Sequence, residues 1–374
     1  MDYYDAIIIG AGPAGSTLAR ALEASGRQVL VVDKAGFPRD KTCAGWVTPA
    51  VLESLDIDRT EYGRGRTLQP IRRFRIGLMG QDPLENDHGE VVSYGIRRCE
   101  FDSFLLDRVR SPKELGAPVR SIERINGNWL VNDRWQAPLL IGAGGHFCPV
   151  ARLLGDGPGK HETVVAAKEV EFEMSPEQAQ ACQARGDTPE LWFCRDLKGY
   201  AWVFRKGNVL NIGLGREDNH RLSDHLADFV EEMKASGRIP ADLPERFKGH
   251  AYLLYGHADR PLADEGVLLI GDAAGLAYTQ SGEGIRPAIE SALIAADVIH
   301  QAPDYSALSL QPYGERIAAR FGNRATDQAP GFDVPDWLKQ AAASALMRSH
   351  WFTRKVVTER WFLHQQVRPL EMAI

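Results

Sequence analysis

The feature that most constrains the fold of this 374-residue chain is a glycine turn between two short apolar segments near its start. Residues 6–9 (AIII) and 29–32 (VLVV) are runs of mostly β-branched side chains, which is typical of buried parallel strands. Between them, GAGPAG at 10–15 leads into apolar residues at helical spacing, and Ser25-Gly26 ends that pattern. The segment therefore predicts a strand, a helix and a parallel strand.

In the GxGxxG spacing, each glycine of this turn has its own structural role. Gly10 allows a tight turn, Gly12 lets the backbone approach a pyrophosphate, and Gly15 lets the helix pack close to the strand. The free N–H groups and the positive dipole end of the helix favour phosphate. Asp33 ends the second strand, where an acid accepts hydrogen bonds from a ribose. The sequence predicts a dinucleotide site.

A second strand-and-glycine signature lies far downstream. Residues 266–275 (GVLLIGDAAG) predict a buried strand that runs into a turn bearing Asp272. Residues 281–285 (SGEGI) then open a helix with small residues on one face, including Ala288, Ser291 and Ala292. Small residues allow this helix to pack closely against other backbone.

Together these segments resemble FAD enzymes of the glutathione-reductase type, and more narrowly the geranylgeranyl reductase and p-hydroxybenzoate hydroxylase group. The resemblance implies noncovalent FAD, with Asp272 on its sugar-alcohol chain and the helix after SGEGI aimed at the flavin pyrimidine. The residues expected to bind the cofactor are Gly10, Gly12, Pro13, Ala14, Gly15, Asp33, Lys34, Lys41, Thr42, Arg98, Gly271, Asp272, Gly282, Gly284 and Ile285.

Three further segments are similar to the reductase branch of that group. PRDKTCAG at 38–45 resembles its PRxKxCGG segment beside the flavin, and RCEFD at 98–102 its RxxFD helix start. GYAWVF at 199–204 and NIGLG at 211–215 resemble strands that line its substrate cavity. The resemblance implies Cys43 and Tyr200 as catalytic residues, and Trp46, Trp202 and Phe204 as substrate contacts.

Simpler structural roles remain open for these residues. Cysteine is often a small buried hydrophobe, and paired aromatics on a strand are often core. The chain also departs from the family pattern: Gly144 replaces an aspartate, Arg205 a proline, and Trp46 a small residue. A bulky Trp46 beside the flavin would shrink or reshape a prenyl-sized pocket.

The order of motifs predicts an α/β fold with two domains and a helical end. We expect a discontinuous Rossmann-type FAD domain from residues 1–75, 96–163 and 250–300. An inserted, mostly antiparallel substrate domain would comprise residues 76–95 and 164–249, with strands at 200–204 and 209–214 and a helix at 222–235. Residues 301–374 are expected to form a C-terminal helical region. Its aromatic-rich end, from about Pro335, is expected to form a helical cap on the FAD domain, with a lid or membrane-surface contact as the alternative.

The expected function is that of an FAD-dependent oxidoreductase that reduces an alkene in a small hydrophobic or conjugated substrate. An aromatic or polyketide-type monooxygenase and a halogenase-like enzyme are the enzyme alternatives, and an electron carrier the non-enzyme one. Since the chain has no second GxGxxG unit, NAD(P)H would bind transiently, or a donor or carrier protein would deliver electrons.

Composition excludes several other classes. A net charge of −6 disfavours a nucleic-acid binder. The five cysteines show no ligand spacing for zinc or an iron–sulfur cluster, and reduced thiols indicate a cytoplasmic protein. No apolar run reaches the ~18–20 residues of a membrane span, and peripheral membrane contact stays open.

Overall fold

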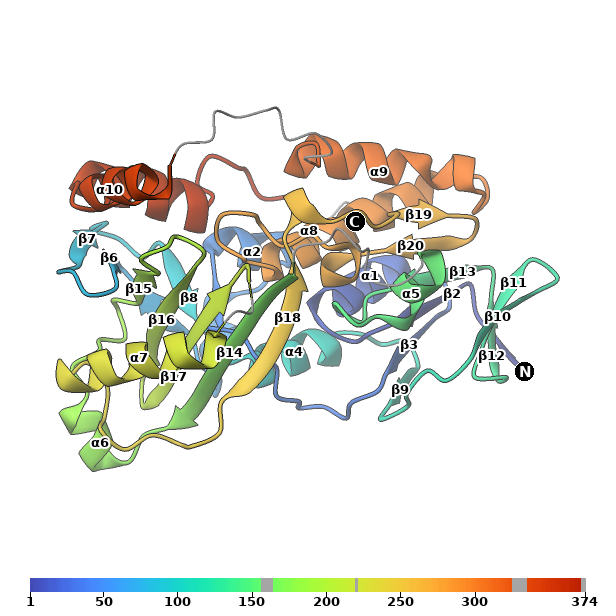
Figure 1. Cartoon of the computed structure of the whole chain (residues 1–374). Helices are drawn as coiled ribbons and strands as arrows, with labels where there is room; N and C mark the ends of the chain where they lie inside the picture. The colour runs from blue at the N-terminus through green and yellow to red at the C-terminus, as the bar shows by residue number, and fades with distance from the viewer. Residues whose placement is uncertain (156–163, 219–220, 325–334, 371–374) are drawn as a thin grey trace.

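The computed structural model describes residues 1–155, 164–218, 221–324 and 335–370 (Figure 1). Its centre is a sheet that is parallel except at one edge. The six strands of this sheet are, in spatial order, β19 (Ala263–Asp264), β20 (Val267–Leu269), β13 (Leu139–Gly142), β2 (Ala6–Ile9), β3 (Val29–Asp33) and β9 (Lys113–Leu115). Only β19 runs antiparallel to its neighbour within this sheet. The strand, helix and strand predicted around the glycine turn are confirmed.

Helices pack on both sides of this sheet and complete the main apolar core. The long α8 (Ile285–Gln301) lies against α1 (Pro13–Ala24), and α9 (Ala307–Phe321) packs on α8 and β19. The shorter helices of this half are α2 (Pro49–Ser54), α3 (Arg59–Gly63), α4 (Arg98–Asp107) and α5 (Pro149–Leu154), with 3₁₀ turns η1 (Tyr255–His257) and η2 (Gly271–Ala274). The small residues on α8 are buried against α1 and η2.

A second large sheet has mixed, mostly antiparallel strands. Its seven strands are, in spatial order, β18 (Lys248–Leu253), β14 (Val164–Glu173), β17 (Val209–Arg216), β16 (Gly199–Lys206), β15 (Glu190–Phe193), β6 (Arg73–Leu78) and β7 (Leu84–Asp87). Only the β15–β6 pair of this sheet is parallel. Gly207 and Asn208 connect β16 to β17, and the φ of +61° at Gly207 suits such a tight hairpin.

Two smaller sheets flank these. One comprises β1 (Asp2–Tyr3), β12 (Trp135–Ala137), β11 (Asn128–Val131) and β10 (Ile122–Ile125), in that order. The other comprises β4 (Trp46–Val47), β8 (Ser93–Gly95) and β5 (Gln69–Ile71). The domain boundaries expected at residues 75/76 and 249/250 fall inside β6 and β18, so the large second sheet takes a few more residues than the pattern suggested.

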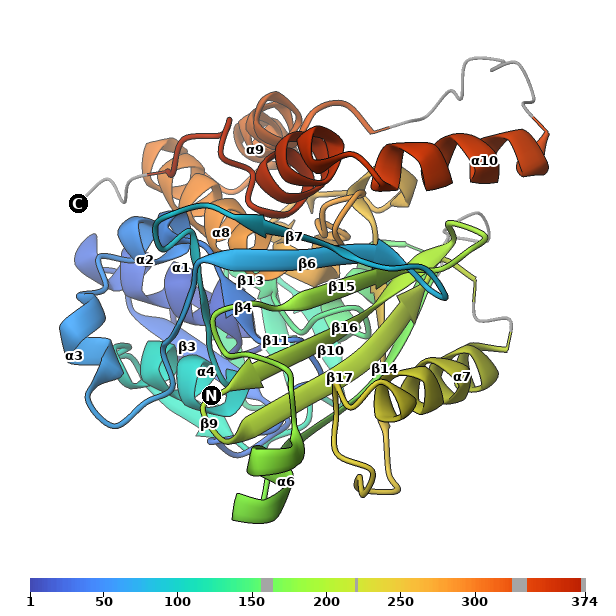
Figure 2. The ribbon, with the colours of Figure 1, turned by 90° about the vertical axis from the view of Figure 1, so that its left-hand side faces the viewer.

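The two faces of the seven-stranded sheet have different coverings (Figure 2). On one face, α7 (Leu222–Ala235) packs on β14 and β17 over an apolar cluster. The short α6 (Pro176–Ala181) follows β14 in the sequence and contributes Ala179 to the same cluster. On the other face, Trp202 and Phe204 belong to a different cluster, because side chains alternate along β16. This second face is turned toward the parallel sheet.

The C-terminal segment covers part of that second face. The helix α10 (Asp336–Met347) contacts β6, and a π-helical segment, η3 (Phe352–Phe362), contacts β7 (Figure 2). Met347, Val357, Phe362 and Leu363 share a buried cluster with Trp46 and Phe204. The expected helical end is present, and it contacts both halves: Phe352, Trp361 and Phe362 pack on the seven-stranded sheet, while Leu370 packs on the core of the parallel-sheet half.

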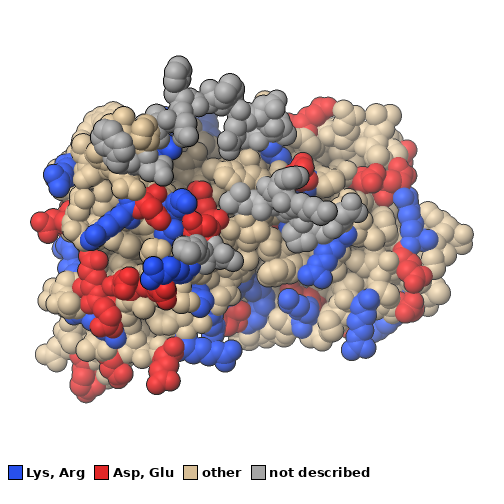
Figure 3. Space-filling view, viewed as in Figure 1, with Lys and Arg blue, Asp and Glu red and all other residues tan. Residues whose placement is uncertain are grey.

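Acidic and basic side chains are interspersed over the face seen in Figure 3. Within the described ranges, every helix is too short or too polar to cross a membrane. The five cysteines are all free thiols.

Candidate active site

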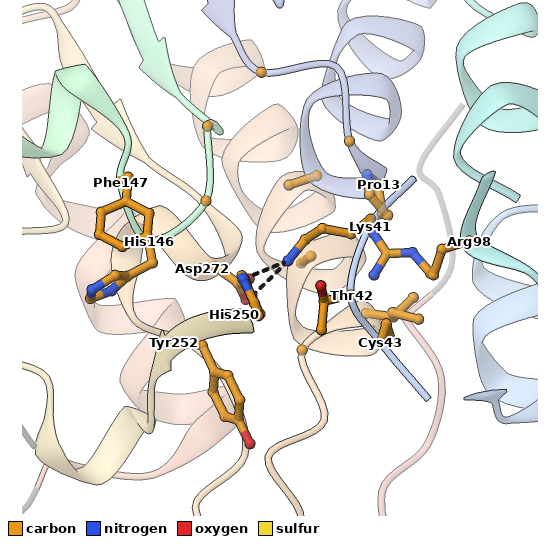
Figure 4. Close-up of a pocket in the computed structure, with 18 of the residues that line it drawn as sticks. Pro13, Lys41, Thr42, Cys43, Arg98, His146, Phe147, His250, Tyr252 and Asp272 are labelled. Carbon is orange, nitrogen blue, oxygen red and sulfur yellow. Dashed lines mark hydrogen bonds and ion pairs between the residues drawn. The ribbon is translucent and has the colours of Figure 1, made fainter. Parts of the chain in front are cut away.

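A cavity of about 690 Å³ lies where the two large sheets face each other (Figure 4). It extends from the glycine turn and the carboxyl ends of β2 and β3 to the N-terminus of α8 and the inner face of the seven-stranded sheet. The predicted site residues that line it are Gly10, Gly12, Pro13, Ala14, Asp33, Lys34, Lys41, Thr42, Cys43, Trp46, Arg98, Tyr200, Trp202, Asp272, Gly282, Gly284 and Ile285. Segments far apart in sequence thus form one site.

Three predicted site residues lie outside the cavity lining. A Cβ at Gly15 would lie 1.8 Å from the carbonyl oxygen of Gly10, so this glycine allows close helix–strand packing. Gly271 has a φ of +60° and sits against Ala288. Phe204 is 2% exposed and packs behind Trp46, so its position corrects the expectation that it contacts a substrate.

The glycine turn leaves room for a phosphate at the start of α1. Gly10 has a φ of +117°, and a Cβ there would lie 2.3 Å from the carbonyl oxygen of Ala143. Gly12 is different, because its Cβ would meet only the Arg39 guanidinium, at 3.1 Å. No side chain caps the first turn of α1, so its N–H groups stay available to an anion.

Asp33 is fixed by the turn that it supports. Its Oδ2 accepts a hydrogen bond from the N–H of Ala11 at 2.7 Å, and its Oδ1 accepts one from Ala35 at 2.9 Å. Each carboxylate oxygen has a second lone pair, so these bonds orient the group without blocking a ribose hydroxyl. The position fits the sugar-binding role that the sequence predicts.

A buried basic pair lies beside Gly12. The guanidinium of Arg98 makes two bonds to Asp102, at 2.8 and 2.9 Å, and Arg39 lies 3.2 Å from the same carboxylate. Asp102 has no exposed surface. Two guanidinium groups around one carboxylate leave excess positive charge at the cavity wall, which suits a dinucleotide phosphate.

Lys41 reaches across the cavity toward the second signature (Figure 4). Its Nζ donates to Nε2 of His250 at 2.6 Å, and that nitrogen lies 4.0 Å from Oδ2 of Asp272. Burial, with the charge of Lys41, lowers the pKa of His250 to about 2, so the imidazole is neutral and accepts the bond. Burial likewise lowers the pKa of Lys41.

The backbone of Cys43 is held by the seven-stranded sheet. Its N–H donates to Oε1 of Glu169 at 2.6 Å, and its carbonyl accepts from Nδ2 of Asn211 at 3.1 Å. Trp202 donates to the same Asn211 side chain at 2.7 Å. Burial raises the pKa of Glu169 to about 7. These bonds leave the thiol facing the cavity, with the N–H of Gly45 3.5 Å from its sulfur.

Aromatic side chains form the wall opposite the glycine turn. The Tyr200 hydroxyl donates to the carbonyl of Ser281, and burial raises its pKa well above the ordinary value. Trp46 packs against Phe74, Phe204 and Phe362, with ring centroids 5.6 to 6.1 Å apart. The C-terminal segment therefore supports this wall from behind.

Sequence reasoning missed several polar residues that line the cavity: Glu169, His250, Tyr252 and Glu283. Glu169 lies in a predicted strand of alternating polar and apolar residues, and Glu283 lies inside the SGEGI segment, so local sequence could have pointed to both residues. His250 and Tyr252 alternate on β18 and reach the site only through the pairing of β18 with β14. In the part of the chain that the structure describes, there is no cluster of three or more metal-binding side chains.

Comparisons with known proteins agree with this geometry. Residues 3–63 match the FAD binding domain family. The chain is 30% identical over 331 residues to a menaquinone reductase of Mycobacterium tuberculosis, covering 80% of this chain and 77% of the relative. It is 29% identical over 349 residues to digeranylgeranylglycerophospholipid reductase 3 of Methanosphaera stadtmanae, covering 86% and 84%.

Solved structures show the same fold. A geranylgeranyl bacteriochlorophyll reductase-like protein of Thermoplasma acidophilum superposes with a TM-score of 0.74 at 22% identity, covering 100% of this chain and 94% of that one. A probable FAD-dependent monooxygenase of Pseudomonas aeruginosa and an FAD-bound halogenase share the fold at TM-scores of 0.64 and 0.69, with 19% and 15% identity.

Proposed function

Because the chain belongs to the family of FAD-dependent oxidoreductases that includes menaquinone reductase and the digeranylgeranylglycerophospholipid reductases, we propose that it reduces a carbon–carbon double bond in a compact, hydrophobic or conjugated substrate. One observation carries this proposal: the cavity that begins at the glycine turn also contains Cys43, Tyr200 and Trp202. Cofactor and substrate would therefore meet in one cavity.

FAD supplies the hydride when it is bound, while the chain sets orientation and access. The turn at Gly10 to Ala14, together with Arg39 and Arg98, would hold the pyrophosphate, and Asp33 would hold a ribose. Asp272 and Lys41 would bind the sugar-alcohol chain, and the N-terminus of α8 would face the pyrimidine. This is a proposal for each residue, supported by its place on the cavity wall.

Reduction of an alkene also needs a proton, and Cys43 and Tyr200 are the first candidates. Both line the cavity, and Cys43 is held at its backbone from two sides. The hydrogen of Tyr200 is engaged with the Ser281 carbonyl, and its pKa is raised well above the ordinary value. Because the hydrogen of Tyr200 is already engaged, Cys43, whose thiol lines the cavity, is the better placed of these two.

The size of the cavity favours a compact substrate. At about 690 Å³ it falls within the range of about 300–1,000 Å³ that is typical of a single small-molecule site, and the flavin would fill much of it. Trp46, backed by Phe362, occupies space in the cavity wall that a small residue would leave open to a long prenyl chain. We therefore favour a conjugated ring with a short side chain, such as a quinone, over a C20 chain.

Electrons would come from NAD(P)H that binds transiently, with a donor protein as the alternative. The glycine turn of residues 10–15 is taken up by the FAD site, and the sequence has no second GxGxxG unit. A stopped-flow trace of flavin bleaching by NADH and by NADPH would decide between direct reduction and a donor protein.

The test is anaerobic turnover. The purified protein would be loaded with FAD, reduced with dithionite, and mixed with menadione, with geranylgeraniol or with a short-chain menaquinone. After reoxidation in air, which returns any hydroquinone to its quinone, mass spectrometry should find a gain of two hydrogens on a carbon–carbon double bond of geranylgeraniol or of the menaquinone side chain, with menadione as the control that lacks a side chain. Loss of this product in Cys43→Ala, but not in the half-buried control Cys99→Ala, would identify the thiol as the proton donor. A long-lived oxygen adduct in place of this product would favour the monooxygenase or halogenase alternative that shares the fold.

A further inference from the structure

A buried carboxyl that no contact satisfies lines the inner end of the cavity. Glu283 lies between Gly282 and Gly284, the N-cap of α8, and its side chain is 8% exposed. Among the described residues, neither of its oxygens has a hydrogen-bond partner. Because burying a polar group without a partner is costly, such a group in a cavity wall indicates an interaction with a bound molecule.

The C-terminal segment places a histidine against this carboxyl. Nε2 of His364 lies 3.9 Å from Oε2 of Glu283, its side chain is 6% exposed, and within the described chain Nε2 has no hydrogen-bond partner. The ring stacks on Tyr278 at 3.7 Å, and the carbonyl of His364 accepts a bond from Arg286 at 3.4 Å. The backbone of His364 has a φ of +47°, in the left-handed region that residues other than glycine seldom adopt.

The charges around the pair favour two neutral groups. Those that face it are Tyr200 from β16, Tyr278 from the preceding loop, and Arg286 and Glu290 from α8. Burial raises the pKa of Glu283 to about 8, and burial with Arg286 lowers that of His364 to about 4. Arg286 is itself bonded to Glu290 at 2.8 Å. At neutral pH the proton therefore resides on Glu283, and the imidazole is free to exchange one.

Two other ionisable groups of the cavity, Glu169 and Tyr200, are committed to structural bonds, whereas the Cys43 thiol, the rival proton source, accepts only from the N–H of Gly45 at 3.5 Å. Glu169 accepts hydrogen bonds from Cys43 and Asn211, and Tyr200 donates its hydrogen to Ser281. Glu283 has a transferable proton and no such bond, which suits a general acid better than it suits a structural residue.

We propose that Glu283, in place of Cys43, is the catalytic acid of the reduction and that His364 restores its proton. The π bond of the substrate is replaced by two C–H bonds, one formed by hydride from the reduced flavin and one by the proton of Glu283. The carboxylate left behind takes up a proton from solvent through Nε2 of His364. This step rests on the proposed function, whereas the protonated state of Glu283 does not.

The proton site can be tested without turnover. Infrared spectra of the full chain in H₂O and D₂O would identify protonated carboxyl groups in the wild type, in Glu283→Gln, and in Glu245→Gln, an exposed control with the same chemical change. At neutral pH we expect a carboxylic-acid band that only Glu283→Gln lacks and that disappears as pH rises through about 8. Its absence from the wild type would overturn the proposal.

Single-turnover kinetics test the transfer itself. The pre-reduced Glu283→Gln variant should form product about 100-fold more slowly than the wild type, with unchanged FAD affinity, and Glu283→Asp should recover part of the rate. Asparagine tolerates the backbone conformation of residue 364, so His364→Asn should slow repeated turnover but not the first. A wild-type rate in Glu283→Gln would refute the acid role. If the wild type reduces no double bond, the proposed function fails and the transfer step with it, while the infrared band still decides the state of Glu283.

Discussion

Nζ of Lys41 lies 2.6 Å from Nε2 of His250, which joins a loop beside the glycine turn to the edge strand β18 of the other sheet. The carboxylate of Asp272, from the second glycine signature, lies 4.0 Å from the same nitrogen. The two halves of the molecule therefore meet at a polar contact on the cavity wall, where the sugar-alcohol chain of FAD is proposed to bind.

Lys41→Met should weaken FAD binding. The change removes a charged hydrogen-bond donor, and such bonds contribute roughly 1.5–3 kcal/mol, which corresponds to about a 10- to 100-fold rise in Kd. Quenching of FAD fluorescence on titration with the apoprotein would measure it. Lys248→Met on the same β18 is the control, because that side chain is 56% exposed. Equal Kd values for the two variants would remove Lys41 from the cofactor site.

Two glycines of the turn should separate folding from cofactor binding. Gly10→Ala would place a methyl group against the Ala143 carbonyl at a strained φ, at a cost of about 1–3 kcal/mol from the backbone alone. Gly12→Ala meets only a flexible arginine, so the fold should tolerate it while the methyl group obstructs the pyrophosphate. Thermal unfolding of the apoproteins should show a lower Tm for Gly10→Ala only, and the visible spectrum of the FAD-loaded proteins should show flavin loss for Gly12→Ala. Retained FAD in Gly12→Ala would contradict this assignment.

Much of the fold could be predicted because local patterns determine it. The apolar runs at 6–9 and 29–32 and the amphipathic segment 222–235 correspond to β2, β3 and α7, since hydrophobic periodicity and turn residues act within a few positions of sequence. The cofactor end of the site followed, because its glycines and Asp33 lie in those same elements.

The aromatic end of the cavity was harder to predict because it depends on contacts between residues distant in sequence. Phe362 and His364 reach the cavity region only because the C-terminal segment folds over the seven-stranded sheet, and no local sequence pattern predicts that packing. His250 faces the cavity because β18 pairs with β14, a register decided by packing. Phe204 followed the pattern of alternation yet lies behind Trp46, since alternation gives the face and not the depth.

Trp46 should control the size of the substrate. Trp46→Ala removes a side chain that packs on Phe74 and stacks on Phe362, so we expect a loss of roughly 3–5 kcal/mol in the free energy of unfolding. The space created should let the variant reduce longer prenylated quinones relative to a short-chain menaquinone. Denaturant unfolding and a substrate chain-length series would measure the two effects. Trp46→Phe is the matched control and should keep the wild-type preference, and an unchanged preference in Trp46→Ala would place the substrate elsewhere.

Glu283 should make the fold less stable in alkaline solution. Its pKa rises on folding from about 4.3 in the unfolded chain to about 8, so proton binding favours the folded state. The stability linked to this proton is fully present below the unfolded pKa and is lost as pH rises through the folded one. Between about pH 5 and about pH 9, Glu283→Gln should therefore lose less stability than the wild type, by up to a few kcal/mol. Denaturant midpoints at matched pH values would measure this difference, with the exposed Glu245→Gln as control. Parallel pH curves for wild type and Glu283→Gln would mean that the carboxyl is ionised in the folded protein, since only a neutral acid gains stability from its proton.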